Sequence, residues 1–206
     1  MSNSTARIYL ASRSPRRREL LRQIGVRYEV LLLRESVDRE DIDETPLPNE
    51  SSVAFVERIA RTKASAGWAR LTQRSIPRYP VLGADTAVIV NHEILGKPMD
   101  RQAACAMLRK LAGRSHEVVT GVALAYEGRC EVLVSTSTVT FKPLSEDEIG
   151  AYVRTGEPLD KAGGYAIQGR AAPFITHLTG SYSGVMGLPL HETAQLLERF
   201  GIKLFE

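Results

Sequence analysis

The chain has 206 residues, of which 43% are hydrophobic and 25% are charged, and its formal net charge is +3. These values are typical of a globular protein that can bury a sizeable core. The basic residues are scattered apart from a cluster between Arg13 and Arg22, which argues against a nucleic-acid-binding surface. No apolar stretch approaches the roughly 18 residues of a membrane span, and no signal-peptide core is present, so we expect a cytoplasmic location. Cys105 and Cys130 are expected to be free thiols.

In the first half of the chain, apolar segments at strand and helix spacing alternate, separated by Gly, Pro and acidic residues. We expect Ser14 to cap the first helix, Pro15 to take its first position and Gly25 to end it. A polar, acidic stretch precedes the second helix and reads as a loop of about twenty residues, which is long enough to favour a functional role. In chain order we predict a strand at 8–11, a helix at 15–24, a strand at 28–33, the loop at 34–52, a helix at 53–69 and a strand at 81–90.

In the second half the predicted strands cluster. Asp100 is expected to cap a helix that Gly113 ends, and residues 145–148 form a capping box. In chain order we predict that helix, a hairpin of strands at 117–126 and 130–141, a helix from the capping box to near Gly156, glycine-rich loops, a strand at 174–178 and a helix at 192–200. This order predicts an α/β fold with a mixed sheet.

The segment from Ser12 to Arg17 is the first candidate site. A strand ends and a helix begins there, so free backbone N–H groups and the positive end of the helix dipole lie beside hydroxyl and guanidinium groups. Arginine presents a planar fork that matches phosphate oxygens. The segment therefore predicts an anion site, and the alternative is an ordinary capped helix with solvated arginines.

Asp85 interrupts the apolar strand predicted at 81–90, which implies a buried carboxylate. Such a group needs a partner, a metal ion or a catalytic task. Lys63 follows Ile59 by four residues on the apolar face of its helix and should point inward or toward a cleft, unless it snorkels to the surface. Lys97, between Gly96 and Pro98, is able to reach a phosphate. For Asp85 we favour a functional role over a structural pairing with a buried lysine or backbone N–H groups, whereas Lys97 alone is a weak indication.

Two further segments carry candidate residues. In the glycine-rich stretch 160–169, Gly163 and Gly164 permit close approach of a ligand, and the amide of Gln168 can both donate to and accept from a base edge. The alternative is a surface amide on a connecting loop. In the acidic loop at 38–44, one carboxylate could share a divalent cation with Asp85, since Mg²⁺ usually takes one or two carboxylates plus substrate phosphates. The alternative there is a solvated loop.

Taken together in chain order, these candidate segments and their neighbours resemble the Maf family of nucleoside triphosphate pyrophosphatases. The resemblance implies a single domain over residues 1–206, with a mixed twisted sheet, flanking helices and two lobes around a cleft, similar to inosine triphosphate pyrophosphatases. It also implies hydrolysis between the α- and β-phosphates with a divalent metal, Mg²⁺ or Mn²⁺, and makes a homodimer possible. Binding to nucleic acid or to a membrane is not expected, because the net charge is modest and no apolar stretch is long enough to span a bilayer. The matching segments are 10–17, 19–21, 59–64, 83–86, 96–98, 108–116, 157–165 and 185–190.

The resemblance also implies roles for individual residues. Asp85 corresponds to the general base that activates water, and Glu44 best matches the loop acid that binds metal with Asp85, with Asp38 and Glu40 as rivals because this loop is longer than is usual. A departure is Ala166, which stands where a glycine is usual. The substrate-binding residues carried over by motif are Ser12, Ser14, Arg16, Arg17, Lys63, Thr86, Lys97, Lys161 and Gln168.

Three of these positions favour a subgroup. Arg16, Thr86 and Gln168 resemble the branch that acts on dTTP and UTP, whereas the branch that acts on 7-methyl-GTP tends to have Trp, Gln and Glu there. The expected function is therefore hydrolysis of dTTP and UTP to the monophosphate and pyrophosphate. The alternatives are the same chemistry on modified or purine nucleotides, or a nucleotide-binding regulator of septum formation.

Overall fold

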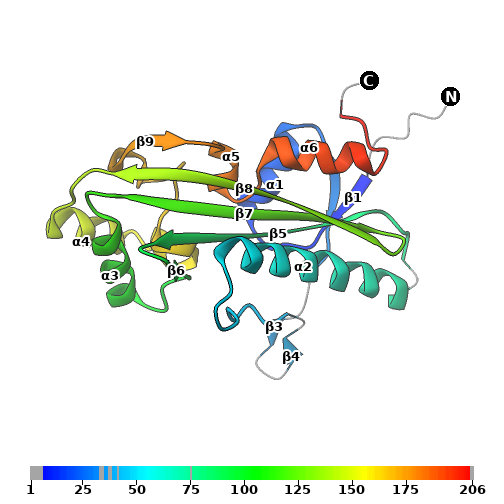
Figure 1. Cartoon of the computed structure of the whole chain (residues 1–206), viewed down its shortest axis with the longest axis horizontal. Helices are drawn as coiled ribbons and strands as arrows, with labels where there is room; N and C mark the ends of the chain where they lie inside the picture. The colour runs from blue at the N-terminus through cyan, green and yellow to red at the C-terminus, as the bar shows by residue number, and fades with distance from the viewer. Residues whose placement is uncertain (1–6, 33–34, 37–38, 41, 75, 205–206) are drawn as a thin grey trace. The chain divides into compact units, whose positions relative to one another are not determined.

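The computed structural model describes residues 7–32, 35–36, 39–40, 42–74 and 76–204 (Figure 1). Its main sheet has seven strands in the order β2-β1-β5-β7-β8-β9, with β6 paired to β5. The pairs β1–β2 and β1–β5 are parallel, whereas β5–β6 and β8–β9 are antiparallel, so the predicted mixed α/β sheet is confirmed. The strands are β1 (Arg7–Leu10), β2 (Arg27–Val30), β3 (Glu35–Ser36), β4 (Arg39–Glu40), β5 (Val81–Val90), β6 (Glu93–Leu95), β7 (Ser115–Tyr126), β8 (Arg129–Phe141) and β9 (Ile175–Thr179).

The helices flank these strands. Asp100 accepts a hydrogen bond from the N–H of Ala103, and the capping box of Ser145 and Glu148 is formed, so both predicted caps are confirmed. The α-helices are α1 (Pro15–Gln23), α2 (Ser52–Arg74), α3 (Arg101–Leu111), α4 (Glu146–Arg154), α5 (Tyr182–Met186) and α6 (Leu190–Arg199), and the 3-10 turns are η1 (Glu157–Asp160), η2 (Ala162–Gly164) and η3 (Ala172–Phe174). Among the described residues, no helix is long and apolar enough to cross a bilayer.

The chain divides into two compact units, and three long strands, β5, β7 and β8, contribute residues to both. Unit 1 comprises residues 1–85, 120–134 and 187–206, and unit 2 comprises residues 86–119 and 135–186. The chain therefore enters each unit more than once. The expectation of one domain with two lobes remains a prediction.

In unit 1, α2 packs closely on the sheet. Figure 1 shows α2 running alongside β5, and small residues line this contact, with Ala60 and Ala64 of α2 clustering with Ala123 and Ala125 of β7. A Cβ atom on Gly83 of β5 would lie 2.6 Å from the carbonyl oxygen of Ala60 and 2.6 Å from the nitrogen of Ala64. Glycine at this position is therefore what lets the helix backbone approach the strand.

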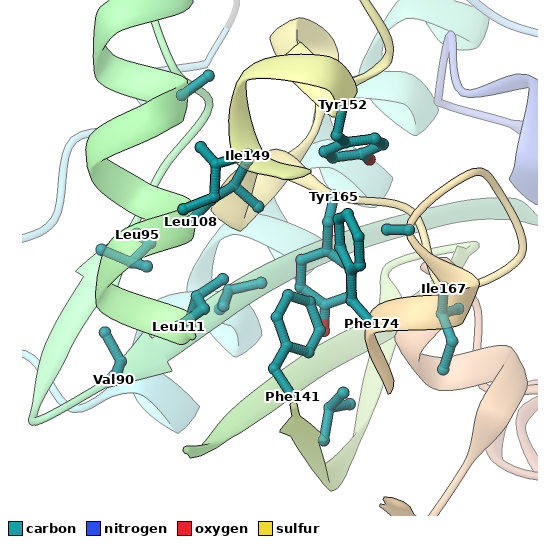
Figure 2. Close-up of a cluster of buried hydrophobic side chains, with 14 of the residues drawn as sticks. Val90, Leu95, Leu108, Leu111, Phe141, Ile149, Tyr152, Tyr165, Ile167 and Phe174 are labelled. Atoms are coloured by element: carbon teal, nitrogen blue, oxygen red, sulfur yellow. The ribbon is translucent and has the colours of Figure 1, made fainter. Parts of the chain in front are cut away.

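In unit 2, the core is built around aromatic rings (Figure 2). Phe141 packs edge-on against Tyr165, with 4.9 Å between ring centroids, and Phe174 packs edge-on against both Phe141 and Tyr152. Edge-to-face pairs of this kind add to the stabilisation from burial. This cluster anchors the glycine-rich segment, because Tyr165 belongs to it.

Several predicted boundaries were wrong. The loop predicted at 34–52 contains the antiparallel strands β3 and β4, which are only two residues each and too short to give a pattern. The helix predicted at 53–69 extends to Arg74, because Leu71 continues its buried stripe. The short helix α5 was missed. The other predicted helices and strands are present, with ends that agree or are shifted by at most three residues.

Candidate functional site

Asp85 lies near the end of the unit 1 part of β5 and is buried, with 8% of its surface exposed. Its oxygen Oδ1 accepts a hydrogen bond of 2.8 Å from Nζ of Lys63. Lys63 is on α2, and its side chain is 13% exposed, so the prediction that it points inward is confirmed. The close approach of α2 to β5 at Gly83 brings the two residues together.

Glu44 completes a three-residue ionic cluster. Its Oε1 lies 2.6 Å from Nζ of Lys63, so one ammonium group contacts the carboxylates of both Glu44 and Asp85. The Glu44 side chain is 47% exposed, whereas that of Asp85 is 12% exposed. The cluster therefore has one buried carboxylate and one half-exposed carboxylate, both in contact with a single ammonium group.

The turn from Ser12 to Arg17 lies at the same edge of the unit 1 sheet as Asp85. The parallel strands β1 and β5 pair Leu10 with Leu82, and both chains run on from there toward the candidate residues. Carboxyl ends of parallel strands meet at one edge, which is where ligands bind in open α/β sheets. The cluster and the turn therefore share one edge of unit 1.

Within this turn the Ser12 hydroxyl oxygen accepts two hydrogen bonds. The donors are the backbone N–H of Ser14, at 3.2 Å, and Nη1 of Arg17, at 3.1 Å. With both lone pairs engaged, the hydroxyl proton of Ser12 is the part that can bind a further acceptor such as a phosphate oxygen. Ser14 takes the N-cap position, as predicted, although its side chain makes no capping hydrogen bond.

Arg17 ties the turn to the segment before α6. Its Nε donates a hydrogen bond of 2.7 Å to the carbonyl oxygen of Gly187. Burial lowers the pKa of the Arg17 guanidinium, the charge of Asp85 raises it, and Arg16 lowers it. The net shift of the Arg17 pKa is downward, because burial outweighs the opposing effect of the carboxylates.

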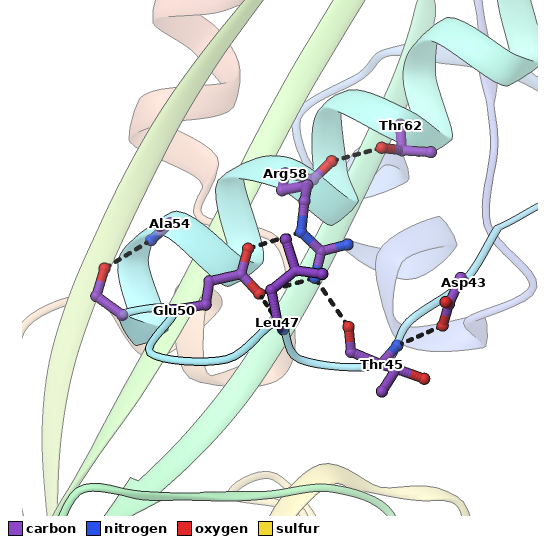
Figure 3. Close-up of polar contacts among 8 residues, drawn as sticks. Asp43, Thr45, Leu47, Glu50, Ala54, Arg58 and Thr62 are labelled. Atoms are coloured by element: carbon purple, nitrogen blue, oxygen red, sulfur yellow. Dashed lines mark hydrogen bonds and ion pairs between the residues drawn. The ribbon is translucent and has the colours of Figure 1, made fainter.

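Arg58 and Glu50 hold the segment that carries Glu44 (Figure 3). Arg58 donates to both carboxylate oxygens of Glu50, from Nε at 2.6 Å and Nη2 at 2.8 Å, and Nη2 also donates to the carbonyl oxygen of Thr45 at 3.0 Å. These hydrogen bonds from Arg58 lower the pKa of Glu50 to about 2. The residue directly after Glu44 is therefore fixed to α2. Of the rival acids, Asp38 and the side chain of Glu40 lie outside the described residues.

In unit 2, Lys97 lies beside the glycine-rich segment. The N–H of Gly163 donates a hydrogen bond of 3.0 Å to the carbonyl oxygen of Gly96, which precedes the exposed Lys97. Gly163 has φ +69°, and a Cβ there would lie 2.8 Å from the Val88 side chain. Glycine is required at this position, so the backbone next to Lys97 is fixed.

The other predicted site residues of unit 2, Thr86, Lys161 and Gln168, come from separate segments of the chain. Thr86 follows Asp85 on β5 and is half-buried. Gln168 is exposed on the turn after Tyr165. Nζ of Lys161 donates a hydrogen bond of 2.8 Å to the carbonyl oxygen of Glu157 and also contacts the carboxylate of Asp160. Lys161 therefore binds the first and last residues of η1 in this structure.

The sequence did not predict the roles of three supporting residues, although Glu157 begins the matching segment 157–165. Arg58, Glu50 and Glu157 act through hydrogen bonds to backbone groups or to residues elsewhere in the chain, and charged residues at such spacings are common on surfaces. Glu50 lies eight residues before Arg58 in the sequence. Side-chain pairing within a helix is expected at separations of three or four residues, so this spacing did not predict their ion pair.

Comparison with known proteins gives consistent results. The family model described as "Maf-like protein" matches residues 7–200. A protein of Nitrosomonas europaea named dTTP/UTP pyrophosphatase is 56% identical over 199 residues, 96% of each chain, and one of Aromatoleum aromaticum with the same name is 58% identical over 201 residues, 97% of this chain and 98% of the relative. The solved structure of the Staphylococcus aureus Ham1 protein has a TM-score of 0.50 at 18% identity, over 94% of this chain and 97% of that one, which shows a likeness of fold.

Proposed function

The chain belongs to the Maf family, and we propose that it hydrolyses dTTP and UTP to the nucleoside monophosphate and pyrophosphate. Its relatives with that name support the substrates. The observation that carries the proposal is the cluster in which Lys63 contacts both Glu44 and Asp85. Such a buried carboxylate, set beside an anion-binding turn, is suited to activating water next to a phosphate.

Asp85 is the proposed general base. Its Oδ1 accepts the hydrogen bond from Lys63, which orients the carboxylate, and Oδ2 is the oxygen that we propose takes a proton from the attacking water. That water forms a bond to the α-phosphorus, and the bond from the α-phosphorus to the bridging oxygen breaks, so that pyrophosphate leaves. A base positioned in this way accelerates a reaction by about 10²–10⁴-fold.

Glu44 and Asp85 are the residues that would hold a divalent cation, Mg²⁺ or Mn²⁺. Both carboxylates contact Nζ of Lys63, so they lie close to each other. Such a pair fits the usual Mg²⁺ site, which takes one or two carboxylates and completes its shell with water and substrate phosphates. Within the described ranges no group of three or more His, Cys, Asp and Glu side chains could hold a metal ion, so such a site would depend on the nucleotide. A bound cation would neutralise charge that develops on the phosphates.

The proposed roles of the other residues follow from their chemistry. Ser12 donates its hydroxyl proton to a phosphate oxygen, while Ser14, Arg16 and Arg17 supply further donors and positive charge at the same turn. Lys63, Lys97 and Lys161 balance the charge of the triphosphate. Thr86 and Gln168 contact the nucleoside, and the Gln168 amide, which both donates and accepts, matches a pyrimidine edge.

A nucleotide panel tests the proposal. The purified protein is incubated with Mg²⁺ or Mn²⁺ and, in turn, dTTP, UTP, CTP, ATP, GTP and 7-methyl-GTP, and pyrophosphate and orthophosphate are measured separately. We expect pyrophosphate from dTTP and UTP at a kcat/KM at least about tenfold above the others, and no release after chelation of the metal. Orthophosphate as the first product, or preference for a purine nucleotide, would contradict the proposal.

A further inference from the structure

The turn that carries Gln168 is fixed at its beginning by the core of unit 2. The N–H of Gly169 donates a hydrogen bond of 3.0 Å to the carbonyl oxygen of Ala166, which closes a tight turn around Ile167 and Gln168. Ile167 is 6% exposed and belongs to the aromatic core cluster (Figure 2). Gln168, the next residue, is exposed. The turn therefore buries one central residue and presents the other.

Glu157 fixes the turn at its far end. The N–H of Arg170 lies 3.0 Å from Oε1 and 3.2 Å from Oε2 of Glu157, and the hydroxyl of Tyr152 donates to the same Oε1 at 2.9 Å. Tyr152 is buried, and burial together with the hydrogen bond to Glu157 raises its pKa. The carboxylate thus links a core tyrosine on α4 to the backbone two residues after Gln168.

Gly169 fits this arrangement because it has no side chain. A Cβ atom there would lie 2.4 Å from Oε1 and 2.6 Å from Oε2 of Glu157. The backbone of Gly169 is not in the left-handed region, so the requirement for glycine arises from the nearby carboxylate rather than from its backbone conformation. The carboxylate and the turn are therefore packed against each other as well as hydrogen-bonded.

We propose that Glu157 is a positioning residue for nucleobase discrimination, which it supports by holding the turn that presents Gln168. The inference rests on the proposed function, in which Gln168 contacts the base. An amide discriminates between bases through directional hydrogen bonds, which must be held within about 0.5 Å and 10–20° of their productive geometry. The side chain of Gln168 is exposed, so the backbone of its turn supplies that precision.

Substitution of Glu157 tests the role through specificity. The variants Glu157→Ala and Glu157→Gln are compared with Gln168→Ala by the ratio of kcat/KM for dTTP to that for CTP and ATP. We expect both Glu157→Ala and Gln168→Ala to lower this ratio about tenfold through KM for dTTP, and to leave kcat for the poor substrates within a few-fold. Glu157→Gln keeps one acceptor oxygen and should restore part of the ratio. Glu146→Gln, an exposed ion-paired residue on α4, is the matched control and should keep it.

A second pair of variants tests the packing. Gly169→Ala should lower the ratio in the presence of Glu157, because the new methyl group displaces the carboxylate or the turn. In the Glu157→Ala background the same change meets no carboxylate and should have no further effect. Equal, additive losses in both backgrounds would overturn the proposed coupling.

The outcomes separate this inference from the function on which it rests. A wild-type ratio in Glu157→Ala, beside a lost ratio in Gln168→Ala, would overturn the role of Glu157 alone. An equal loss of activity toward all nucleotides would show that Glu157 maintains the fold and not specificity. Failure of the wild-type protein to release pyrophosphate from dTTP or UTP would contradict the proposed function, and the inference with it.

Discussion

At the scale of single residues, the chemistry centres on one ammonium group between two carboxylates. The Lys63–Asp85 contact is mostly buried, whereas the Lys63–Glu44 contact is half exposed and is weakened by solvent. Removing one partner of a buried pair typically costs about 3–5 kcal/mol, because the other charge is left in the interior. A substitution that keeps the shape of Asp85 is therefore a cleaner probe of its role than removal of Lys63.

Asp85→Asn is expected to lower kcat by about 10²–10⁴-fold, because the amide cannot take a proton from water. The KM for dTTP should change only a few-fold, since the turn at Ser12–Arg17 is unaltered. Steady-state pyrophosphate release measures both constants. Glu127→Gln, at the exposed tip between β7 and β8, is the control and should behave as wild type. Near-normal turnover by Asp85→Asn would contradict the role of Asp85 as base.

The sequence predicted the placement of the charged side chains Asp85 and Lys63 better than it predicted the hydrogen-bond partners of the supporting residues. Asp85 within an apolar run predicted a buried carboxylate, and the helical spacing of Lys63 predicted its inward direction. The link from Arg58 to the carbonyl oxygen of Thr45 could not be predicted, because a backbone acceptor leaves no trace in residue types. The same holds for Glu157, whose partner is the N–H of Arg170.

At the scale of elements, the contact between α2 and β5 sets the distance between Lys63 and Asp85. Gly83 precedes Asp85 by two residues, and its missing side chain is what allows the two backbones to come close. Any group added there has to push the helix away from the strand. The stability of unit 1 and the geometry of the ionic cluster are therefore coupled through one residue.

Gly83→Ala is expected to destabilise the protein by about 1–3 kcal/mol, as overpacking of a core does, and to lower kcat as well. Chemical denaturation and pyrophosphate release measure the two effects. Gly150→Ala is the matched control, because a Cβ there meets only the flexible end of Arg154 at 3.3 Å and alanine favours the interior of α4. A stable, fully active Gly83→Ala variant would show that the close approach does not matter.

The elements themselves were predicted where the sequence pattern is long. The strand at 81–90 was predicted with its observed bounds, because ten mostly apolar residues lie between polar turns. The strands β3 and β4 were not predicted, since two residues carry no periodicity. The end of α2 was placed five residues early, because the residues after Ala69 are mostly polar and hide the single buried Leu71.

At the scale of the whole molecule, buried groups make stability depend on pH. His116 is 3% exposed, and its Nε2 lies 2.8 Å from the hydroxyl of Tyr165 in the core of unit 2. Burial lowers the pKa of His116 to about 4. Since the unfolded chain binds a proton near the ordinary pKa of about 6.5, acidification favours unfolding between these two values.

The free energy of unfolding should therefore fall as the pH drops from about 6.5 to about 4, by up to about 1.4 kcal/mol per pH unit from His116 alone. Below about 4.5 the loss of the charge on Glu50, whose pKa is lowered by Arg58, should continue the decline. Denaturation at several pH values measures this dependence. His116→Phe should flatten the dependence between pH 6.5 and 4, whereas the exposed His177→Gln should leave it unchanged. An unaltered dependence in His116→Phe would contradict the assignment.

The fold class and the family could be predicted from the sequence, because the motifs span most of the chain in a fixed order. The family is confirmed by the match over residues 7–200, and the mixed sheet with flanking helices is confirmed by the strand pairing. The roles of the individual residues stay predictions, since they depend on how a bound nucleotide meets them. Direct contacts join Lys63 to Glu44 and Asp85, and join Ser12 to Ser14 and Arg17.

The position of water attack is the most direct test of the central claim. Hydrolysis of dTTP in water enriched in heavy oxygen, followed by mass spectrometry of both products, shows which phosphorus receives the new oxygen. Attack at the α-phosphorus predicts the label in the nucleoside monophosphate and none in pyrophosphate. Label in pyrophosphate, which attack at the β-phosphorus would give, would contradict the account.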